Sequence, residues 1–140
     1  MSIVSDIEKL KKEKNAVILA HYYVDEDVQD IADYIGDSFY LSKAATKVDQ
    51  DRIIFAGVEF MGESAKILNP DKRVFMPDMN ADCPMAHMAD KDEILKLREE
   101  YDDLAVVCYI NSTAELKKYS DVCVTSSNAV KIVKNLPNKN

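Results

Sequence analysis

The sequence predicts an α/β fold built from repeated three-layer α/β/α units, each with a short parallel sheet. The apolar run AVILAHYY (16–23) is echoed by AVVCYIN (105–111), and both runs end in ring and polar side chains. Continuous apolar runs of this length are typical of parallel strands that are covered on both faces. Segments of helical and strand composition follow each run in a similar order, which indicates two copies of one unit.

The first unit, placed at residues 1–88, is expected to contain three strands. The apolar run from Ala16 supplies the first strand, and a helical stretch follows it. The acidic residues Asp25, Glu26 and Asp27 open this helix, where negative charge is favourable because of the helix dipole. The remaining expected elements are a strand over 52–56, a helix over 60–68, a turn over 69–71 and a strand over 73–78.

The second unit, placed at residues 89–140, begins its sheet with the run from Ala105. A helix over 113–119, a strand over 121–124 and a helix over 128–136 are expected to follow. We equate this last strand and helix with 52–56 and 60–68 of the first unit. A third strand is then missing, so we expect an incomplete unit that exposes apolar surface around Val106, Val122 and Val130. The isolated chain should be marginally stable, self-associating or dependent on a missing carboxyl-terminal part.

Composition limits the classes of partner. The chain has 140 residues, 47% of them hydrophobic and 31% charged, which suits one ordinary domain or two small units. Its net charge of −7 argues against a nucleic-acid surface. No apolar run approaches the roughly 20 residues that cross a bilayer, and the start of the chain does not read as a signal peptide. We therefore expect a cytoplasmic protein with no nucleic-acid or membrane partner.

The three cysteines include no CxxC pair, so neither a disulfide framework nor a zinc site is predicted. Cys108 and Cys123 lie in apolar strands, where buried and unreactive thiols are expected. Cys83 lies in a loop just before Pro84, and proline is favoured at the first position of a helix. A cysteine at a helix N-terminus has a stabilised thiolate, which suits a ligand or nucleophile. A small capping residue is the alternative.

His21 ends the first apolar run, after a strand with no polar side chain. This position favours a functional histidine over a satisfied core residue, because α/β sheets bind ligands at the carboxyl ends of their strands. Tyr22 and Tyr23 alternate faces if the strand continues, so one of them should share a pocket with His21, and a period of two favours Tyr23. Tyr23 could then relay a proton; simple aromatic packing is the alternative.

Hydroxyl side chains are expected at two helix starts. Ser38 follows Gly36-Asp37 and precedes a stretch of helical composition, so we expect it to be the N-cap. Ser126 lies in the segment TSSN (125–128), between a strand and a helix. Helix N-termini bind phosphate and carboxylate groups, so each serine could also hold a small anion. No glycine motif of a dinucleotide or ATP site is present.

Five ordered motifs cover nearly the whole chain: AHYY (20–23), GDS (36–38), PDMNADCPMAHM (77–88), YINSTAE (109–115) and DVCVTSSNAV (121–130). With these motifs the chain resembles the amino-terminal part of the quinolinate synthase family, the A proteins of NAD biosynthesis. The resemblance implies three similar α/β domains around a pseudo-threefold axis. It also implies an iron–sulfur cluster held by three cysteines, one per domain, with one iron position open to act as a Lewis acid.

The resemblance assigns roles to residues of this chain. Cys83 would be the first ligand of a 4Fe-4S cluster. His21 and Tyr23 would be catalytic, with Tyr23 assisting proton transfers. The substrates would be iminoaspartate and dihydroxyacetone phosphate, which condense to quinolinate. The residues implied to bind them are His21, Ser38, Tyr109, Ile110, Asn111 and Ser126.

The second and third cluster cysteines of the family, and a later His-x-Glu motif, have no counterparts in this sequence. We therefore expect an amino-terminal portion of an iron–sulfur transferase, inactive alone, that requires carboxyl-terminal domains or a completing chain. The alternative is a stand-alone, non-catalytic α/β module that binds small anions. Binding of malate-like or phosphate ligands without product formation, under anaerobic reconstitution with iron and sulfide, would favour that alternative.

Overall fold

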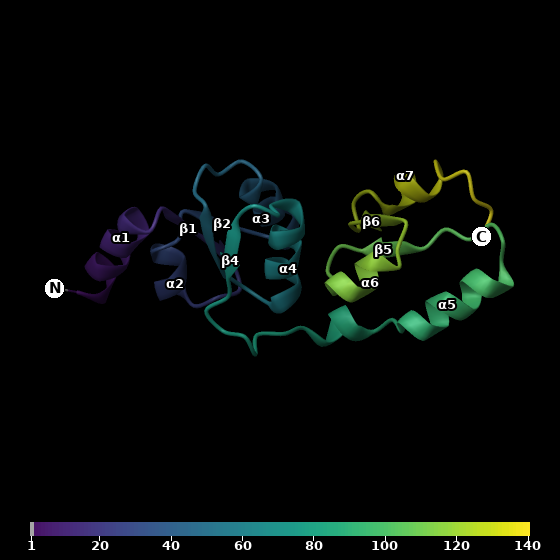
Figure 1. The fold of residues 1–140 in the computed structure, drawn as a ribbon, viewed down its shortest axis with the longest axis horizontal. Coiled ribbons are helices and arrows are strands. Elements are labelled where there is room, and N and C mark those ends of the chain that lie inside the picture. Colours follow the sequence, from purple (N-terminus) through teal and green to yellow (C-terminus); the bar gives the residue numbers. More distant parts are fainter. Residues whose placement is uncertain (1) are drawn as a thin grey trace. The chain divides into compact units, whose positions relative to one another are not determined.

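The computed structural model describes residues 2–140, which form two compact units (Figure 1). The first unit ends at Asp82, and the second runs from Cys83 to Asn140. This division falls after residue 82, whereas the sequence placed it after residue 88. Both units combine helices with short parallel strands, which confirms the predicted α/β class. Among the described residues, no helix is long and apolar enough to cross a membrane.

The first unit contains a four-stranded parallel sheet with the strand order β2-β1-β3-β4. Strand β2 was not predicted, because its three residues are too short to show a period and two of them are exposed. The acidic run opens α2 as expected. The elements in chain order are α1 (Ile3–Glu13), β1 (Ala16–His21), α2 (Glu26–Asp30), β2 (Tyr34–Gly36), α3 (Ser38–Ala45), β3 (Arg52–Ala56), α4 (Glu59–Leu68) and β4 (Arg73–Phe75).

The core of this unit lies between the sheet and helices α3 and α4. Leu19, Ile53 and Phe55 of the sheet are fully buried, and Leu41 of α3 is buried with them. Each such side chain stabilises the fold by about 1.5–3 kcal/mol relative to an exposed one. Gly62 lets β4 run close to α4, because a Cβ at this position would lie 2.3 Å from Met76 Sδ. The core therefore fixes the central strands against α3 and α4.

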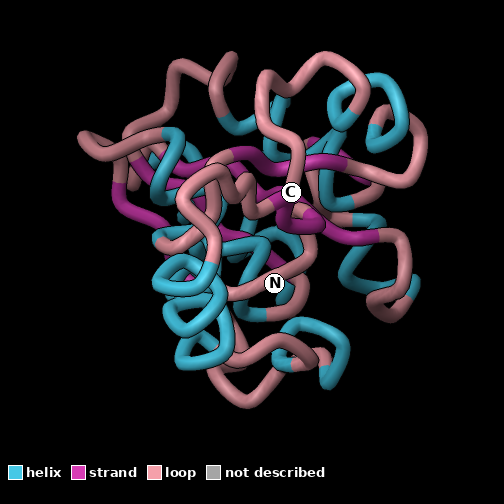
Figure 2. The backbone as a smooth tube through the Cα atoms, turned by 90° about the vertical axis from the view of Figure 1, so that its right-hand side faces the viewer, coloured by secondary structure: helices cyan, strands magenta, loops and turns pink. Residues whose placement is uncertain are grey.

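The second unit contains a two-stranded parallel sheet, β5 beside β6. Its strands have three residues each and are shorter than the sequence indicated. Figure 2 colours all strands of the chain magenta and the helices cyan. Val130 is exposed, whereas Val106 and Val122 are half-buried. The elements are the 3₁₀ helix η1 (Pro84–His87), α5 (Lys91–Glu100), β5 (Val107–Tyr109), α6 (Ala114–Lys118), β6 (Val122–Val124) and α7 (Ala129–Val133).

The same aspartate-centred contact joins β1 to β2 in the first unit and β5 to β6 in the second. In the first unit, Asp33 Oδ2 accepts a hydrogen bond from Ile18 N at 2.8 Å, and Asp33 N donates to Ile18 O at 2.9 Å. In the second unit, Asp121 makes the same two bonds with Val106, at 2.8 and 2.9 Å. Each aspartate also pairs with a cation of the unit's first α-helix. Lys11 Nζ lies 2.9 Å from Asp33, and Arg98 Nη2 lies 2.8 Å from Asp121.

The matching contacts of Asp33 and Asp121 show which elements of the two units are structurally equivalent. The segment from α5 to α7 matches the segment from α1 to α3, so β5 is the counterpart of β1, and β6 is the counterpart of β2. The sequence alignment that equated residues 121–124 with 52–56 was therefore wrong, because it did not foresee β2. Elements β3, α4 and β4 have no counterpart among the described elements of the second unit.

Candidate functional site

In the first unit, β1 and β2 end side by side at the carboxyl edge of the sheet. His21 and Gly36 are partners in register, and Tyr22 N donates to Gly36 O at 3.2 Å. A Cβ at Gly36 would lie 2.3 Å from Tyr40 Cδ1, so glycine is needed for the tyrosine ring to pack on this strand end. The pairing brings the end of β1 next to the turn that enters α3.

Helix α3 begins beside His21, but its cap is Asp37. The Asp37 carboxylate accepts from Tyr40 N at 2.7 Å, and Ser38 is the first residue of the helix. The expectation that Ser38 is the N-cap was wrong, because aspartate is an equally good cap and occupies the extended position just before the helix. Ser38 stays at the N-terminus of α3, where anions are favoured. The GDS motif itself contained the signal for Asp37.

His21 is buried, with 6% of its surface exposed. Its Nδ1 accepts a hydrogen bond from Tyr23 N at 3.2 Å. In the neutral ring this assigns the proton to Nε2, which is then a donor. Burial lowers the pKa of His21, and the nearby carboxylate of Asp37 offsets part of that shift. The ring is therefore neutral at neutral pH and offers an N–H to an acceptor such as a carboxylate or phosphate oxygen.

Both tyrosines after His21 pack against the imidazole. The Tyr22 ring stacks on it with centroids 4.5 Å apart, and the Tyr23 ring meets it edge-on at 4.6 Å. The expectation that strand alternation would bring only one tyrosine to His21 was wrong, because β1 ends at His21 and the chain turns. Tyr23 is the more exposed, at 82% against 47% for Tyr22. A hydrogen bond with Tyr23 raises the pKa of Tyr22.

The turn that carries the tyrosines is held by a residue that the sequence did not single out. Gln29 of α2 donates from Nε2 to Val24 O at 2.8 Å and to Tyr22 O at 3.3 Å. A glutamine in a short helix gives no sequence signal of such a role, and Gln29 is half-buried. Its two bonds position the loop that follows His21.

The second unit repeats this strand-end geometry with different side chains. Ile110 N donates to Val124 O at 2.9 Å, as Tyr22 N does to Gly36 O. Tyr109 therefore occupies the position of His21, and by the same register Asn111 matches Tyr23 and Ser126 matches Ser38. Tyr109 and Ser126 are exposed, whereas Ile110 and Asn111 are half-buried. The predicted polar side chains of this unit lie at one strand edge.

The turn before α7 is organised by side-chain bonds. Thr125 N donates to Asn128 Oδ1 at 2.8 Å, and Asn128 is the N-cap. The hydroxyls of Thr125 and Ser127 lie 2.9 Å apart. Ser126, between them, is exposed to solvent.

Cys83 precedes a helix that starts with Pro84, as the sequence predicted, but this helix is a single 3₁₀ turn, η1. The thiol is half-buried. Within residues 2–140, no group of three or more His, Cys, Asp or Glu side chains could hold a metal ion. Cys83 thus offers one ligand, and the described residues by themselves do not fit an iron–sulfur cluster.

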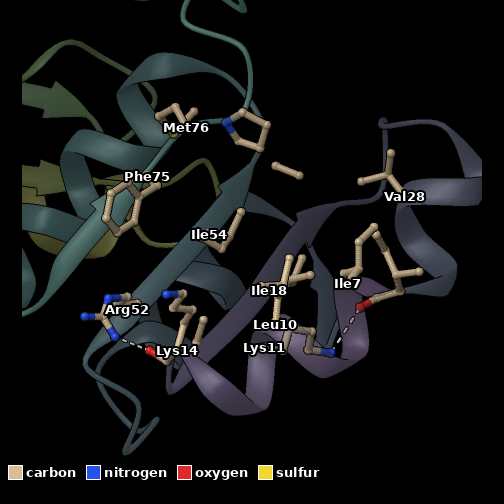
Figure 3. Close-up of a pocket in the computed structure, with 14 residues that line it drawn as sticks. Ile7, Leu10, Lys11, Lys14, Ile18, Val28, Arg52, Ile54, Phe75 and Met76 are labelled. Atoms are coloured by element: carbon tan, nitrogen blue, oxygen red, sulfur yellow. Dashed lines mark hydrogen bonds between the residues drawn. The ribbon is translucent and has the colours of Figure 1, made fainter. Parts of the chain in front are cut away.

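A cavity of about 660 Å³ in the first unit lies elsewhere (Figure 3). It lies on the sheet face opposite α3 and α4, where Ile18 and Ile54 point into it beside Phe75. Lys14 and Arg52 line one end, and Arg52 Nη1 donates to Lys14 O. None of the side chains predicted for the site line this cavity.

Comparison with known proteins identifies related sequences. Residues 5–140 match the family model described as "Quinolinate synthetase A protein". A quinolinate synthase of Fusobacterium nucleatum is 69% identical over 134 residues, which are 96% of this chain and 45% of the relative. One of Clostridium perfringens is 57% identical over 139 residues, 99% of this chain and 46% of the relative. One of Pyrococcus abyssi is 59% identical over 136 residues, which are 97% of this chain and 46% of the relative. The chain spans less than half the length of these relatives.

Proposed function

The chain belongs to the quinolinate synthetase A protein family, and we propose that it forms part of an enzyme that condenses iminoaspartate with dihydroxyacetone phosphate to give quinolinate. This reaction is a step of NAD biosynthesis, and its iron–sulfur-dependent transferase chemistry belongs to the proposal. The identity of 69% to a named quinolinate synthase supports it. We place the enzyme in the cytoplasm.

The observation that carries the proposal is the state of His21 at the end of β1. The Nδ1 atom of the neutral imidazole accepts a hydrogen bond from Tyr23 N, so the ring proton is on Nε2, which can donate to a ligand. The lowered pKa of His21, caused by its burial, keeps the ring neutral in a chain whose net charge is −7. Such a donor suits the carboxylate and phosphate oxygens of both substrates.

The other site residues are assigned complementary roles. Ser38 lies at the N-terminus of α3, where its hydroxyl and the helix dipole favour an anion. Tyr23, exposed and in contact with the imidazole, is assigned to proton transfers during enolisation and ring closure. In the second unit, the substrate contacts are assigned to Tyr109, Ile110, Asn111 and Ser126.

Cys83 is assigned as one ligand of a 4Fe-4S cluster, which such enzymes hold through cysteine thiolates. When bound, the cluster supplies a Lewis acid to the substrate. The other thiolates would come from carboxyl-terminal domains or a completing chain, because the described residues hold no further group of ligands. The roles given above to His21, Tyr23 and Ser38 do not depend on a step at the cluster.

The test is quinolinate formation by the product of the complete reading frame that contains this chain, reconstituted anaerobically with iron and sulfide. We expect turnover, and we expect His21→Leu to raise KM for iminoaspartate by more than about tenfold, since one charge-assisted hydrogen bond is worth about 1.5–3 kcal/mol. His21→Gln places an amide N–H near the position of Nε2 and should recover part of the loss. A fully loaded protein that binds malate or phosphate but forms no quinolinate would support the anion-binding module instead.

A further inference from the structure

Cys108 and Cys123 face each other across the two strands of the second unit. They are Cα partners in the parallel register of β5 and β6. Neighbouring strands lie about 4.7–4.9 Å apart, which is within the range of about 4.4–6.8 Å that the Cα atoms of a disulfide span. In-register residues of parallel strands project to the same face of the sheet. The backbone therefore already holds the two cysteines at bridging distance.

The two thiols are near enough to influence each other's ionisation. Burial, the neighbouring sulfur and a hydrogen bond with Cys108 together raise the pKa of Cys123. The Cys108 thiol lies 3.4 Å from the carbonyl oxygen of its neighbour Tyr109. Both cysteines are half-buried where the sequence suggested complete burial, so small reagents can reach them. The shared register and the partial exposure distinguish this pair from two inert core residues.

We propose that Cys108 and Cys123 form a redox-active dithiol that closes to a disulfide by exchange with a low-molecular-weight disulfide. The thiolate of Cys108 attacks one sulfur of the reagent, which forms a mixed disulfide and releases one small thiol. The thiolate of Cys123 then attacks the Cys108 sulfur and releases the second small thiol. The two protein thiols are oxidised, the small disulfide is reduced, and two thiol protons pass to the two released thiolates.

The position of the pair gives the reaction a consequence. Strand β5 leads into Tyr109–Asn111, and β6 leads into the turn with Ser126, so a disulfide would tie together the two strands that carry these loops. A regulatory meaning of this link rests on the proposed function, whereas the thiol chemistry does not. The first unit has Ala20 and Ile35 at the equivalent positions and therefore lacks the pair.

The test uses the 140-residue chain, reduced and then incubated with oxidised glutathione, alkylated and digested for mass spectrometry. We expect a peptide pair linked through Cys108 and Cys123, reversible by dithiothreitol, while Cys83 is recovered unlinked to either. The variants Cys108→Ala and Cys123→Ile copy the side chains of the first unit, and circular dichroism checks that each is folded. Cys123→Ile should accumulate the mixed disulfide at Cys108, whereas Cys83→Ser should form the linked peptide at the unaltered rate.

Phenylarsine oxide gives a second measurement without oxidation, because it binds two adjacent thiols and releases water. The native chain should bind one equivalent, and either single variant of the pair should lose this binding while its circular dichroism stays native. Recovery of both cysteines as separate alkylated thiols, with no arsenical bound, would overturn the proposal. A linked peptide that forms only in urea would overturn it too, since the folded strands would then not present the pair.

Discussion

Replacing Asp33 should destabilise the first unit, because this side chain bonds both a strand and a nearly buried cation. Asp33 Oδ2 accepts from Ile18 N at 2.8 Å, and Oδ1 lies 2.9 Å from Lys11 Nζ. The Lys11 side chain is 12% exposed and that of Asp33 is 35% exposed. The carboxylate therefore satisfies one donor of the central strand and one ammonium group at the same time.

The magnitude follows from these two contacts. Asp33→Ala removes the acceptor of Ile18 N, which costs about 1–3 kcal/mol for a partly buried donor. Loss of the partly exposed ion pair adds about 0.5–1 kcal/mol. Lys11 keeps Glu8 Oε1 at 2.9 Å and Ile31 O at 3.3 Å, so its charge is not left alone. We expect a total loss of about 2–3 kcal/mol. Asp33→Asn keeps an acceptor oxygen and should lose about 1 kcal/mol.

Urea denaturation gives the free energy of unfolding, and hydrogen exchange with mass spectrometry places the loss in the first unit. Asp121→Ala is the matched control, because Asp121 makes the same bond to Val106 N, but its side chain is 46% exposed and its partner Arg98 is 33% exposed. We expect about 1 kcal/mol there, and faster exchange confined to β5 and β6. Equal losses from the two alanine variants would refute the argument that the greater burial of Ile18 and Lys11 sets the difference.

Three further predictions concern the proposed site. In the complete enzyme, Tyr23→Phe should lower kcat by about tenfold or more, because this is a typical contribution of a proton-transfer group. Tyr22→Phe should leave kcat unchanged. The reverse result would exchange the roles of the two tyrosines. Cys83→Ser should abolish the iron–sulfur absorbance that Cys108→Ala retains, and a full cluster in the serine variant would remove Cys83 from the ligands. Burial lowers the pKa of His21, so the unfolded chain binds the proton of this residue more readily than the folded chain. The contribution of His21 to stability should therefore be fully present above pH about 6.5 and decline as the pH falls below that value. Urea titrations at a series of pH values, made on the native chain and on His21→Leu, would measure this decline.

The sequence located every strand except β2, but it did not predict the helices α1 and α5. Strands β1 and β3 were placed correctly because each contains five or six consecutive, mostly apolar residues. Strand β2 has three residues and exposes two of them, so no period marks it. Its pairing is shown by its register with β1 and by the hydrogen bonds of Asp33, which the sequence does not reveal. That omission also misaligned the two units, since β6 then had no proper counterpart.

The places of the proposed site residues in the fold were predicted better than their contacts. The end of an apolar strand located His21, and the hydroxyl-rich turns located Ser38 and Ser126. The sequence could not show that β1 stops at His21, which brings both tyrosines onto the imidazole instead of one. Nor could it show that Cys108 and Cys123 are in register, because strand register depends on contacts distant in sequence.

The two units keep the same backbone bonds while the side chains at their strand ends differ. Ile18 and Val106 receive the same aspartate contact, and the next bonds along the strands also match. None of these bonds uses the side chain of Tyr109 or of Ser126, both exposed, so their replacement should change ligand contacts and leave the fold intact. His21 is different, because it is buried and bonded to its own turn. Substitutions in the second unit therefore separate binding from folding more cleanly, and those at His21 need a donor-restoring partner such as His21→Gln.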